Sequence, residues 1–376
     1  MSITICLFAK AMECPEVGGH LWAYLNWALG LRALGCQVIW MEAVDLETPE
    51  NERQARLTNL RIRLKPYGLA ESIALCSWTG QSLSRDVIAG CLSIEAMDRV
   101  DLLLNMGYGI PAEIVRRFRR SALLDIDPGL TQIWISEGQM YVAPHDTYFT
   151  IGETVGQAGQ SFPDLGLKWQ YVPPCVALDW WPLYPPTQGA AFTTISQWYT
   201  EEWVQAGDEL YRNDKRTGFL PLLDLPQRTD QPLELALALG ENEEDRAMLR
   251  DRGWRVRDAD AVASTPWDYQ RYIQNSFGEF SCAKPSCVRL QNAWISDRTL
   301  CYLGSGKPAV VQHTGPSRFL PDRAGLFRFR DLEEAVDCFN VVTTDYERQC
   351  RFARALAEEY FDAKKVVGGM LEKALA

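Results

Sequence analysis

The chain has 376 residues, of which 47% are hydrophobic and 23% charged, a composition typical of a globular protein that is too long for one core. Its net charge of -11 and its pI near 5.0 argue against nucleic acid, or an anionic membrane surface, as the partner of the whole surface. It contains no run of about 18 apolar residues, so we expect no transmembrane segment.

The amino terminus has neither a basic start nor a small-residue cleavage site, so it does not resemble a signal peptide. The 11 cysteines are scattered, and their spacings match no common zinc arrangement. These features predict a cytoplasmic protein without disulfides, structural metal or cofactor.

The first 43 residues have the clearest pattern of strand, helix and strand. Residues 2–9 (SITICLFA) predict a strand, and residues 36–43 (CQVIWMEA) predict a second one. Between them, residues 19–35 predict a helix that is apolar nearly all round and therefore packed on both sides. The turn before this helix contains Gly18-Gly19-His20. This order is typical of the start of a parallel sheet.

The rest of the amino-terminal half continues the alternation. It contains two further apolar runs that predict strands and two amphipathic segments that predict helices, followed by a long segment rich in Gly, Pro and aromatic residues. The strands are predicted at 100–107 and 121–127, the helices at 52–68 and 111–120, and loops with short strands at 128–182. The proline-rich residues 171–191 predict a domain boundary, because closely spaced prolines interrupt regular structure.

After the boundary the alternation starts again. Strands are predicted at 191–198, 233–240, 254–258, 278–283 and 308–315, and helices at 242–253, 265–276, 296–306, 331–342 and 345–375, the last with a kink at Phe361-Asp362. We therefore expect two α/β domains in tandem, each with a mostly parallel sheet. In such sheets ligands bind beyond the carboxyl ends of the strands, so the crevice between two facing domains is the expected site.

Three stretches resemble the GT-B glycosyltransferases, which have two Rossmann-like domains facing a cleft. Residues 17–42 resemble the glycine-rich opening of that fold, residues 296–315 (SDRTLCYLGSGKPAVVQHTG) its nucleotide-sugar segment, and residues 345–361 its closing helices. The resemblance implies an acceptor-binding domain at 1–175 and a nucleotide-sugar-binding domain at 190–345. It also implies that residues 346–376 pack back toward the amino-terminal domain.

One position departs from the family pattern. Many retaining members carry a Glu, in the helix before the Gly-Lys-Pro segment, that holds the donor ribose, whereas Cys301 falls about there in this chain. Asp297 and Glu279 are the alternative candidates for that role. Glu279 and Ser281 alternate with Phe280, so both polar side chains share one face of the predicted strand.

The donor diphosphate carries about two negative charges, which a metal-free site neutralises with basic side chains, backbone N–H groups and helix N-termini. The basic candidates are Lys215, Arg216, Lys284 and Arg298, and the alternative for each is a solvated surface charge. The other candidate donor-binding residues are Gly18, Gly19, Trp198, Glu279, Ser281, Ser296, Asp297, Thr299, His313, Thr314 and Gly315. For Trp198 the alternative is packing in the core.

His20 is the candidate catalytic base, because an inverting transfer needs a group that takes the acceptor proton and neutral His suits this near pH 7. Asp125 and Asp127, at the end of a predicted strand, are candidates to orient it. The alternatives are that His20 merely begins a helix, or that the reaction retains configuration and needs no base. His145 and Glu153 are weaker candidates for acceptor binding.

Together these features predict a glycosyltransferase of the hexosyltransferase class. It would move a sugar from a nucleoside-diphosphate sugar, such as a UDP-sugar, to the hydroxyl of an unspecified small molecule, glycan or protein, without metal or cofactor. An NDP-sugar epimerase and a non-catalytic nucleotide-sugar-binding protein on the same fold are the alternatives. A dinucleotide oxidoreductase is disfavoured, because the full G-x-G-x-x-G pattern is absent after the first strand.

Overall fold

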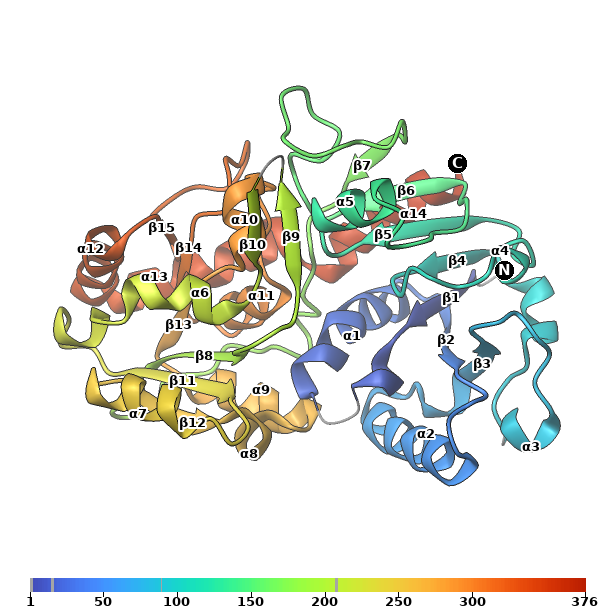
Figure 1. Ribbon diagram of the computed structural model, residues 1–376, viewed down its shortest axis with the longest axis horizontal. Helices are drawn as coiled ribbons and strands as arrows, with labels where there is room; N and C mark the ends of the chain where they lie inside the picture. The colour runs from blue at the N-terminus through green and yellow to red at the C-terminus, as the bar shows by residue number, and fades with distance from the viewer. Residues whose placement is uncertain (1–2, 15–16, 89, 207–208) are drawn as a thin grey trace. The chain divides into compact units, whose positions relative to one another are not determined.

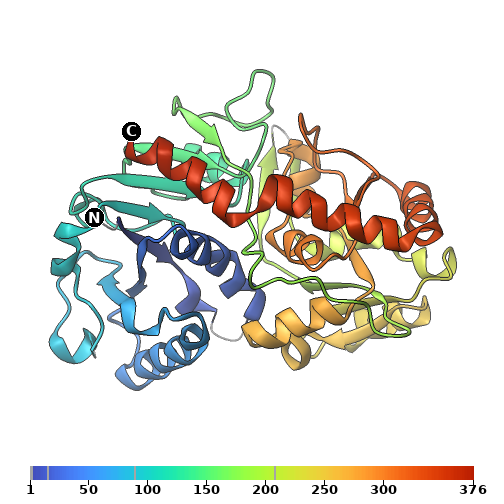
Figure 2. The same ribbon diagram turned by 180° about the vertical axis from the view of Figure 1, so that it is seen from behind.

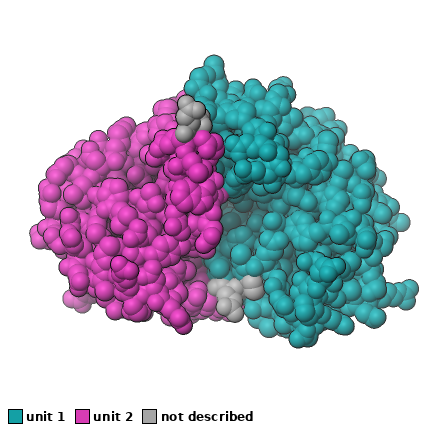
Figure 3. Space-filling view, in the orientation of Figure 1, with its two compact units in different colours: residues 1–177, 363–376 teal, residues 178–362 magenta. Residues whose placement is uncertain are grey.

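The computed structural model describes residues 3–14, 17–88, 90–206 and 209–376 (Figure 1). The chain divides into two compact units, coloured separately in Figure 3. Unit 1 comprises residues 1–177 and 363–376, and unit 2 comprises residues 178–362. Each unit has its own mostly parallel sheet, which confirms the predicted α/β class.

The sheet of unit 1 has seven strands in the order β3-β2-β1-β4-β5-β6-β7, and every neighbouring pair is parallel. The strand order reverses at β1, whose neighbours are β2 and β4. In open parallel sheets, ligands bind at the carboxyl ends of the strands on either side of such a reversal. The strands are β1 (Thr4–Ala9), β2 (Gln37–Val44), β3 (Ile73–Ser77), β4 (Leu102–Asn105), β5 (Ser121–Asp125), β6 (Thr147–Thr150) and β7 (Trp169–Tyr171).

Helix α1 (Gly18–Ala33) is buried along most of its length, as its apolar sequence predicts. It packs against α14 (Ala363–Leu375), the last helix of the chain, which completes unit 1 (Figure 2). The two backbones approach closely at Gly30, where an added Cβ would lie 2.9 Å from the Cβ of Ala363. The other helices of unit 1 are α2 (Glu50–Leu64), α3 (Arg85–Ile88), α4 (Ala112–Val115) and α5 (Leu130–Ser136).

The main sheet of unit 2 has six parallel strands in the order β12-β11-β8-β13-β14-β15, and its order reverses at β8. The strands are β8 (Phe192–Gln197), β11 (Leu233–Ala238), β12 (Arg255–Asp258), β13 (Gly278–Ser281), β14 (Ala309–Gln312) and β15 (Leu326–Phe329). An antiparallel pair, β9 (Trp203–Ala206) and β10 (Glu209–Arg212), follows β8. The ligand-binding position that this topology favours is therefore at the carboxyl ends of β8 and β13.

Apolar side chains from one face of this sheet pack against α12 (Leu332–Thr344) and the segment around Leu225, forming a hydrophobic core cluster of unit 2. Among them Phe280, on β13, stacks on Phe329, on β15, with ring centroids 5.6 Å apart. The helices of unit 2 are α6 (Lys215–Phe219), α7 (Glu243–Asp251), α8 (Ala259–Ala263), α9 (Pro266–Asn275), α10 (Pro285–Leu290), α11 (Asp297–Gly304), α12 (Leu332–Thr344) and α13 (Tyr346–Leu356).

Most predicted elements are confirmed to within a few residues, apart from residue 2, which lies outside the described residues. The predicted kink is also confirmed, because a π-helical turn at Ala357–Phe361 separates α13 from α14. The predicted helix over 111–120 is wrong beyond Val115. Arg116 and Arg120 would stand four residues apart on that helix, where like charges repel. Within the described residues, no helix combines the length and apolar character that a membrane crossing requires.

Candidate functional site

Lys215 lies beside the carboxyl end of β13, at the position that the topology favours. It is the first residue of α6, and its Nζ donates a hydrogen bond to the carbonyl of Cys282, the residue after β13. Burial, and to a smaller extent the positive charges of Arg298 and Lys284, lower the pKa of Lys215 to about 8. Burial and the two neighbouring cations thus both disfavour the positive charge of Lys215, whose Nζ lies 5.8 Å from the centroid of the Trp294 ring.

Arg298, on the first turn of α11, is buried and fully engaged. Its Nε donates to Oε1 of Glu279 at 2.9 Å, and its Nη1 donates to the carbonyl of Ile195 at 2.9 Å. Its Nη2 donates to Oγ of Ser281. Glu279 and Ser281 thus share a face of β13, as their alternation predicts. The face binds an arginine, however, and the carboxylate of Glu279 is not exposed.

Lys284 precedes α10 and is paired with an acid that the sequence analysis did not identify. Its Nζ lies 3.0 Å from Oε2 of Glu202. The same oxygen accepts a hydrogen bond from Nδ2 of Asn213 at 2.6 Å, while Oδ1 of Asn213 accepts one from the backbone N–H of Ser286 at 2.9 Å. Glu202 and Asn213 flank the β9–β10 hairpin, and no motif in the sequence marks them.

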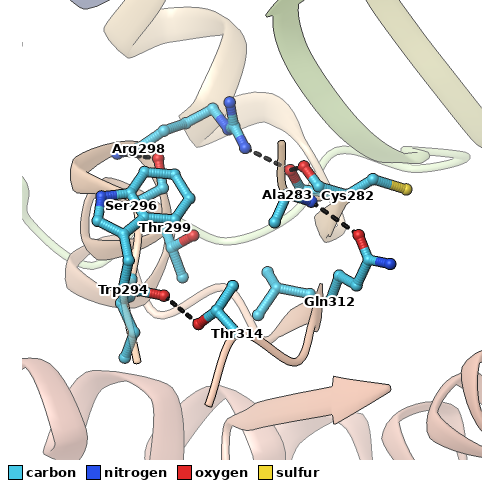
Figure 4. A pocket seen from close by; sticks show the side chains of 11 residues that line it. Cys282, Ala283, Trp294, Ser296, Arg298, Thr299, Gln312 and Thr314 are labelled. Atoms are coloured by element: carbon cyan, nitrogen blue, oxygen red, sulfur yellow. Dashed lines mark hydrogen bonds between the residues drawn. The ribbon is translucent and has the colours of Figure 1, made fainter. Parts of the chain in front are cut away.

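A small pocket opens at the ends of β13 and β14 (Figure 4). Its free volume of about 20 Å³ suits one water-sized group. Thr314 closes one side of it and donates a hydrogen bond to the carbonyl of Trp294 at 2.6 Å. Five of the predicted donor-binding residues line this pocket: Ser281, Ser296, Arg298, Thr299 and Thr314.

Gly315 has a φ of 141°, and a Cβ added there would lie 2.6 Å from the carbonyl oxygen of Gln291. The glycine is therefore required by a close approach of two loops of unit 2. His313 precedes this turn, and its Nδ1 accepts a hydrogen bond from the N–H of Gly315 at 3.3 Å. Burial, followed by the nearby charges of Arg330 and Arg328, lowers the pKa of His313.

Trp198 and Arg216, two of the predicted donor-binding residues, share one partner in unit 2. Both bind the carboxylate of Asp245, on the first turn of α7. Nε1 of Trp198 donates to it at 2.7 Å, and Nε of Arg216 donates to it at 2.8 Å. Trp198 is fully buried, so the alternative of core packing describes its environment. Asp297 is the first residue of α11, directly after the N-cap Ser296.

In unit 1, His20 lies in the first turn of α1, close to the reversal at β1. Its Nε2 is 3.0 Å from the carbonyl oxygen of Lys10, the residue after β1. A carbonyl accepts hydrogen bonds and never donates, so Nε2 carries the proton of the neutral ring. Nδ1 is consequently the nitrogen with an available lone pair. Gly18 and Gly19 begin the same helix.

Asp125 is buried at the end of β5 and receives several hydrogen bonds. The donors are the hydroxyls of Tyr108, Thr131 and Thr150, the amide of Gln132 and the N–H of Asp127. These hydrogen bonds hold Asp125 to the residues around the end of β5. The partner of Nε2 of His20 is the Lys10 carbonyl. Burial, followed by the charges of Glu42 and Asp127, raises the pKa of Tyr24, whose ring lies 5.3 Å from that of His20.

His145 and Glu153 are both buried in unit 1. Nδ1 of His145 lies 2.6 Å from the carbonyl of Ala143, and its Nε2 lies 3.2 Å from Nδ2 of Asn105. Burial lowers the pKa of His145 to about 4, so the ring is neutral at pH 7. Among the described residues, no three His, Cys, Asp or Glu side chains are grouped so that they could hold a metal ion.

Comparison with known proteins identifies the fold. No protein-family model and no curated protein matches the sequence. Among solved structures, an alpha-glucosyltransferase in complex with UDP and a 13-mer DNA is 9% identical over 100% of both chains, with a TM-score of 0.63. Anabaena Alr3699/HepE in complex with UDP and glucose is 12% identical over 99% of both chains, with a TM-score of 0.57. A glycosyltransferase from Rickettsia africae is 13% identical over 99% of this chain and 98% of that one, with a TM-score of 0.56.

The chain has the GT-B fold. This confirms the fold that the three resembling stretches imply. Within the GT-B fold of this chain, the order of each main sheet reverses at its first strand, β1 or β8. His20 follows the first of these strands along the chain, and Lys215 follows the second, so each unit presents one candidate residue near its reversal.

Proposed function

We propose that this protein is a glycosyltransferase that moves a hexose from a nucleoside-diphosphate sugar to an acceptor hydroxyl. The observation that carries the proposal is the group of Lys215, Lys284 and Arg298 around the carboxyl end of β13. A dianionic diphosphate is the chemistry that such a group favours. The solved structures of this fold that contain UDP support a UDP-sugar as the donor.

Lys215 has the central role in this proposal. Arg298 is paired with Glu279, and Lys284 is paired with Glu202, so the charges of both are largely compensated. The acceptor that Lys215 contacts is a neutral carbonyl. A diphosphate bound at Lys215 would raise the lowered pKa of its ammonium group and would gain a charge-assisted hydrogen bond. The same contact would stabilise the departing diphosphate without a metal ion.

His20 is the base in the proposed reaction, which inverts the configuration of the sugar. Its Nδ1, left unprotonated by the hydrogen bond from Nε2 to Lys10, would take the proton of the attacking acceptor hydroxyl. Unit 1 would accordingly bind the acceptor, and unit 2 the donor.

The first test is the affinity for UDP, measured by calorimetry. We expect Lys215→Met to weaken binding about 10- to 100-fold, the loss of one charge-assisted hydrogen bond. Lys373→Met, on the last turn of α14, is the matched control and should bind UDP like the wild type. Equal affinity in both variants, or no binding of UDP to the wild type, would refute the donor site.

The second test is turnover of UDP-hexoses with and without candidate acceptors. Transfer requires an acceptor, whereas an epimerase would alter the sugar without one. We expect His20→Ala to lower transfer about 10²- to 10⁴-fold while leaving UDP affinity unchanged. The anomeric configuration of the product, read by NMR, tests inversion directly, and a retained configuration would exclude His20 as the base.

A further inference from the structure

Glu42, on β2, is a buried acid that neither the donor site nor the proton transfer described above uses directly. Three N–H groups point at its carboxylate. The backbone N–H of Ala11 and Nε1 of Trp40 lie 3.0 and 2.8 Å from Oε1, and the N–H of Met12 lies 3.2 Å from Oε2. Glu42 also pairs in register with Ala9, the last residue of β1. The carboxylate therefore holds the chain where it leaves β1.

The Lys10–Ala11 peptide bond links this carboxylate to His20. Because a peptide unit is planar and trans, its N–H and its C=O point in opposite directions. The N–H belongs to Ala11 and donates to Glu42, while the C=O belongs to Lys10 and accepts from Nε2 of His20. Fixing one end of the unit fixes the direction of the other.

We propose that Glu42 is a positioning residue that sets the tautomer of His20 through the Lys10–Ala11 peptide unit. Its hydrogen bonds keep the Lys10 carbonyl aimed at Nε2, so the proton stays on Nε2 and Nδ1 stays free to accept one. Only the catalytic consequence rests on the proposed function. The tautomer itself is a property of unit 1 and can be measured without any substrate.

The carboxylate suits this place better than its amide isostere. All three neighbours are donors, so each oxygen of Glu42 must accept. In Glu42→Gln, the amide NH₂ would face either the N–H of Met12 or the N–H groups of Ala11 and Trp40. One of the hydrogen bonds that hold residues 10–12 in place would be lost, while the volume of the side chain is kept. The direct competitor is a role in packing alone, which would leave the His20 ring unchanged.

The test is ¹⁵N NMR of the imidazole rings, which is simple here because the chain has three histidines. In the wild type, in alkaline buffer, we expect a protonated Nε2 and an unprotonated Nδ1 in His20. His145 is an internal control for the opposite tautomer, because its Nδ1 faces a carbonyl and its Nε2 faces the NH₂ of Asn105. The His20 signals are assigned by their loss in His20→Asn.

In Glu42→Gln we expect the His20 signals to move toward a mixture of tautomers, with His145 and His313 unchanged. The control Glu47→Gln, at an exposed position after the same strand, should leave all three rings unchanged. A pure Nε2–H tautomer in folded Glu42→Gln, or an Nδ1–H tautomer in the wild type, overturns the proposal. If Glu42→Gln does not fold, Glu42→Asp, which keeps the carboxyl group but shortens the side chain, gives the same readout.

Kinetics separate this inference from the proposed function. If the protein is a glycosyltransferase, Glu42→Gln should lower kcat about 10- to 100-fold, as expected for a misplaced base, with UDP affinity unchanged. If Glu42→Gln shows mixed tautomers but the wild type shows no transfer, the inference about the tautomer holds and the proposed function is refuted. Unchanged kcat with a mixed tautomer would refute the catalytic consequence.

Discussion

Asp245 shows how a single residue can organise one end of a sheet. Its carboxylate accepts hydrogen bonds from Trp198, from the hydroxyl of Tyr199 and, through two nitrogens, from Arg216. Burial acts to raise the pKa of Asp245, but the hydrogen bonds from Arg216, Tyr199 and Trp198 outweigh it and hold the pKa below its usual range. Removing this carboxylate would leave a buried indole N–H and an arginine without their acceptor.

We expect Asp245→Ala to lower the free energy of unfolding by about 2–3 kcal/mol. The value is below that for a fully buried pair, because the side chain of Arg216 is 34% exposed. Glu243→Ala, on the same helix, is the control. Its partner is Arg246 and its side chain is 75% exposed, so the cost should be below about 1 kcal/mol. Urea denaturation measures both, and equal costs would contradict this account.

His145 makes the stability of unit 1 depend on pH. The folded ring is neutral with a pKa of about 4, whereas an unfolded His titrates near 6.5, so the unfolded state binds more protons between these values. The stabilising contribution is therefore complete above about pH 6.5 and is lost as the pH falls toward 4. A difference of about two and a half pKa units corresponds to on the order of 3 kcal/mol.

His145→Gln removes this titration and is expected to lose stability at pH 7. Its deficit relative to the wild type should shrink as the pH falls from 6.5 to 4. Chemical denaturation at several pH values measures the difference, and a deficit independent of pH would show that the ring does not titrate as described.

Residue roles in the candidate site were predictable only where they depend on local pattern. The alternation around Phe280 correctly places Glu279 and Ser281 on one face of β13. Their partner Arg298 lies on another element, and side-chain pairing across elements has no periodic signature. Glu202 and Asn213 were missed for the same reason, since each acts on a residue more than 70 positions away.

At the scale of elements, helices α1 and α14 approach each other closely at Gly30. A Cβ added there would lie 2.9 Å from both the Cβ of Ala363 and Cγ2 of Val367, and 3.0 Å from the carbonyl oxygen of Ala363. These distances are shorter than van der Waals contact, and neither a backbone carbonyl nor a buried Val can move aside easily. The glycine is what allows the two helices to approach.

We expect Gly30→Ala to lower the free energy of unfolding by about 1–3 kcal/mol, despite the better helix propensity of Ala. Gly369→Ala, in α14, provides a control of opposite sign. No atom lies within 4 Å of a Cβ added at Gly369, so the gain of about 0.5–1 kcal/mol from helix propensity should appear undiminished. The melting temperatures of the two variants should shift in opposite directions from that of the wild type. A higher melting temperature for Gly30→Ala would contradict the close packing.

Elements with strong periodicity or clear caps were predictable, and short ones were not. The helix over 265–276 was recognisable from its Thr-Pro start, and Thr265 caps it by accepting a hydrogen bond from Asp268. Strands β3 and β15 were missed, because strands of only five and four residues carry too little pattern. The β9–β10 hairpin was missed because Trp203 and Leu210 are exposed and lack the alternation of a half-buried sheet.

At the scale of the whole molecule, the alternation of strands and helices predicted both sheets, because each βαβ unit is encoded locally. The path of the last helix depends on long-range packing. The backbone N–H of Ala363 donates to the carbonyl of Val176 at 3.0 Å, and the N–H of Ala177 donates to Oδ1 of Asn26 at 3.0 Å. The point where the chain leaves unit 1, at Ala177, and the point where it re-enters, at Ala363, therefore lie close together.

This arrangement makes the stability of unit 1 depend on the last 14 residues of the chain. Helix α14 buries Val366, Val367 and Met370, and each buried side chain of this size contributes about 1.5–3 kcal/mol. Their sum is comparable to the whole stability of a typical domain, about 5–15 kcal/mol. A chain that ends at Asp362 should therefore lose much of the stability of unit 1, while every residue of unit 2 is retained.

Hydrogen exchange measured by mass spectrometry locates this loss within one sample. We expect peptides from β1 and α1 to exchange markedly faster in the truncated chain than in the full-length chain. Peptides from β13 and β14 should keep their protection, because all the described residues of the core cluster around Phe280 belong to unit 2. Equal acceleration in all four elements would mean that the two units unfold together, and unchanged exchange in β1 and α1 would mean that α14 does not support unit 1.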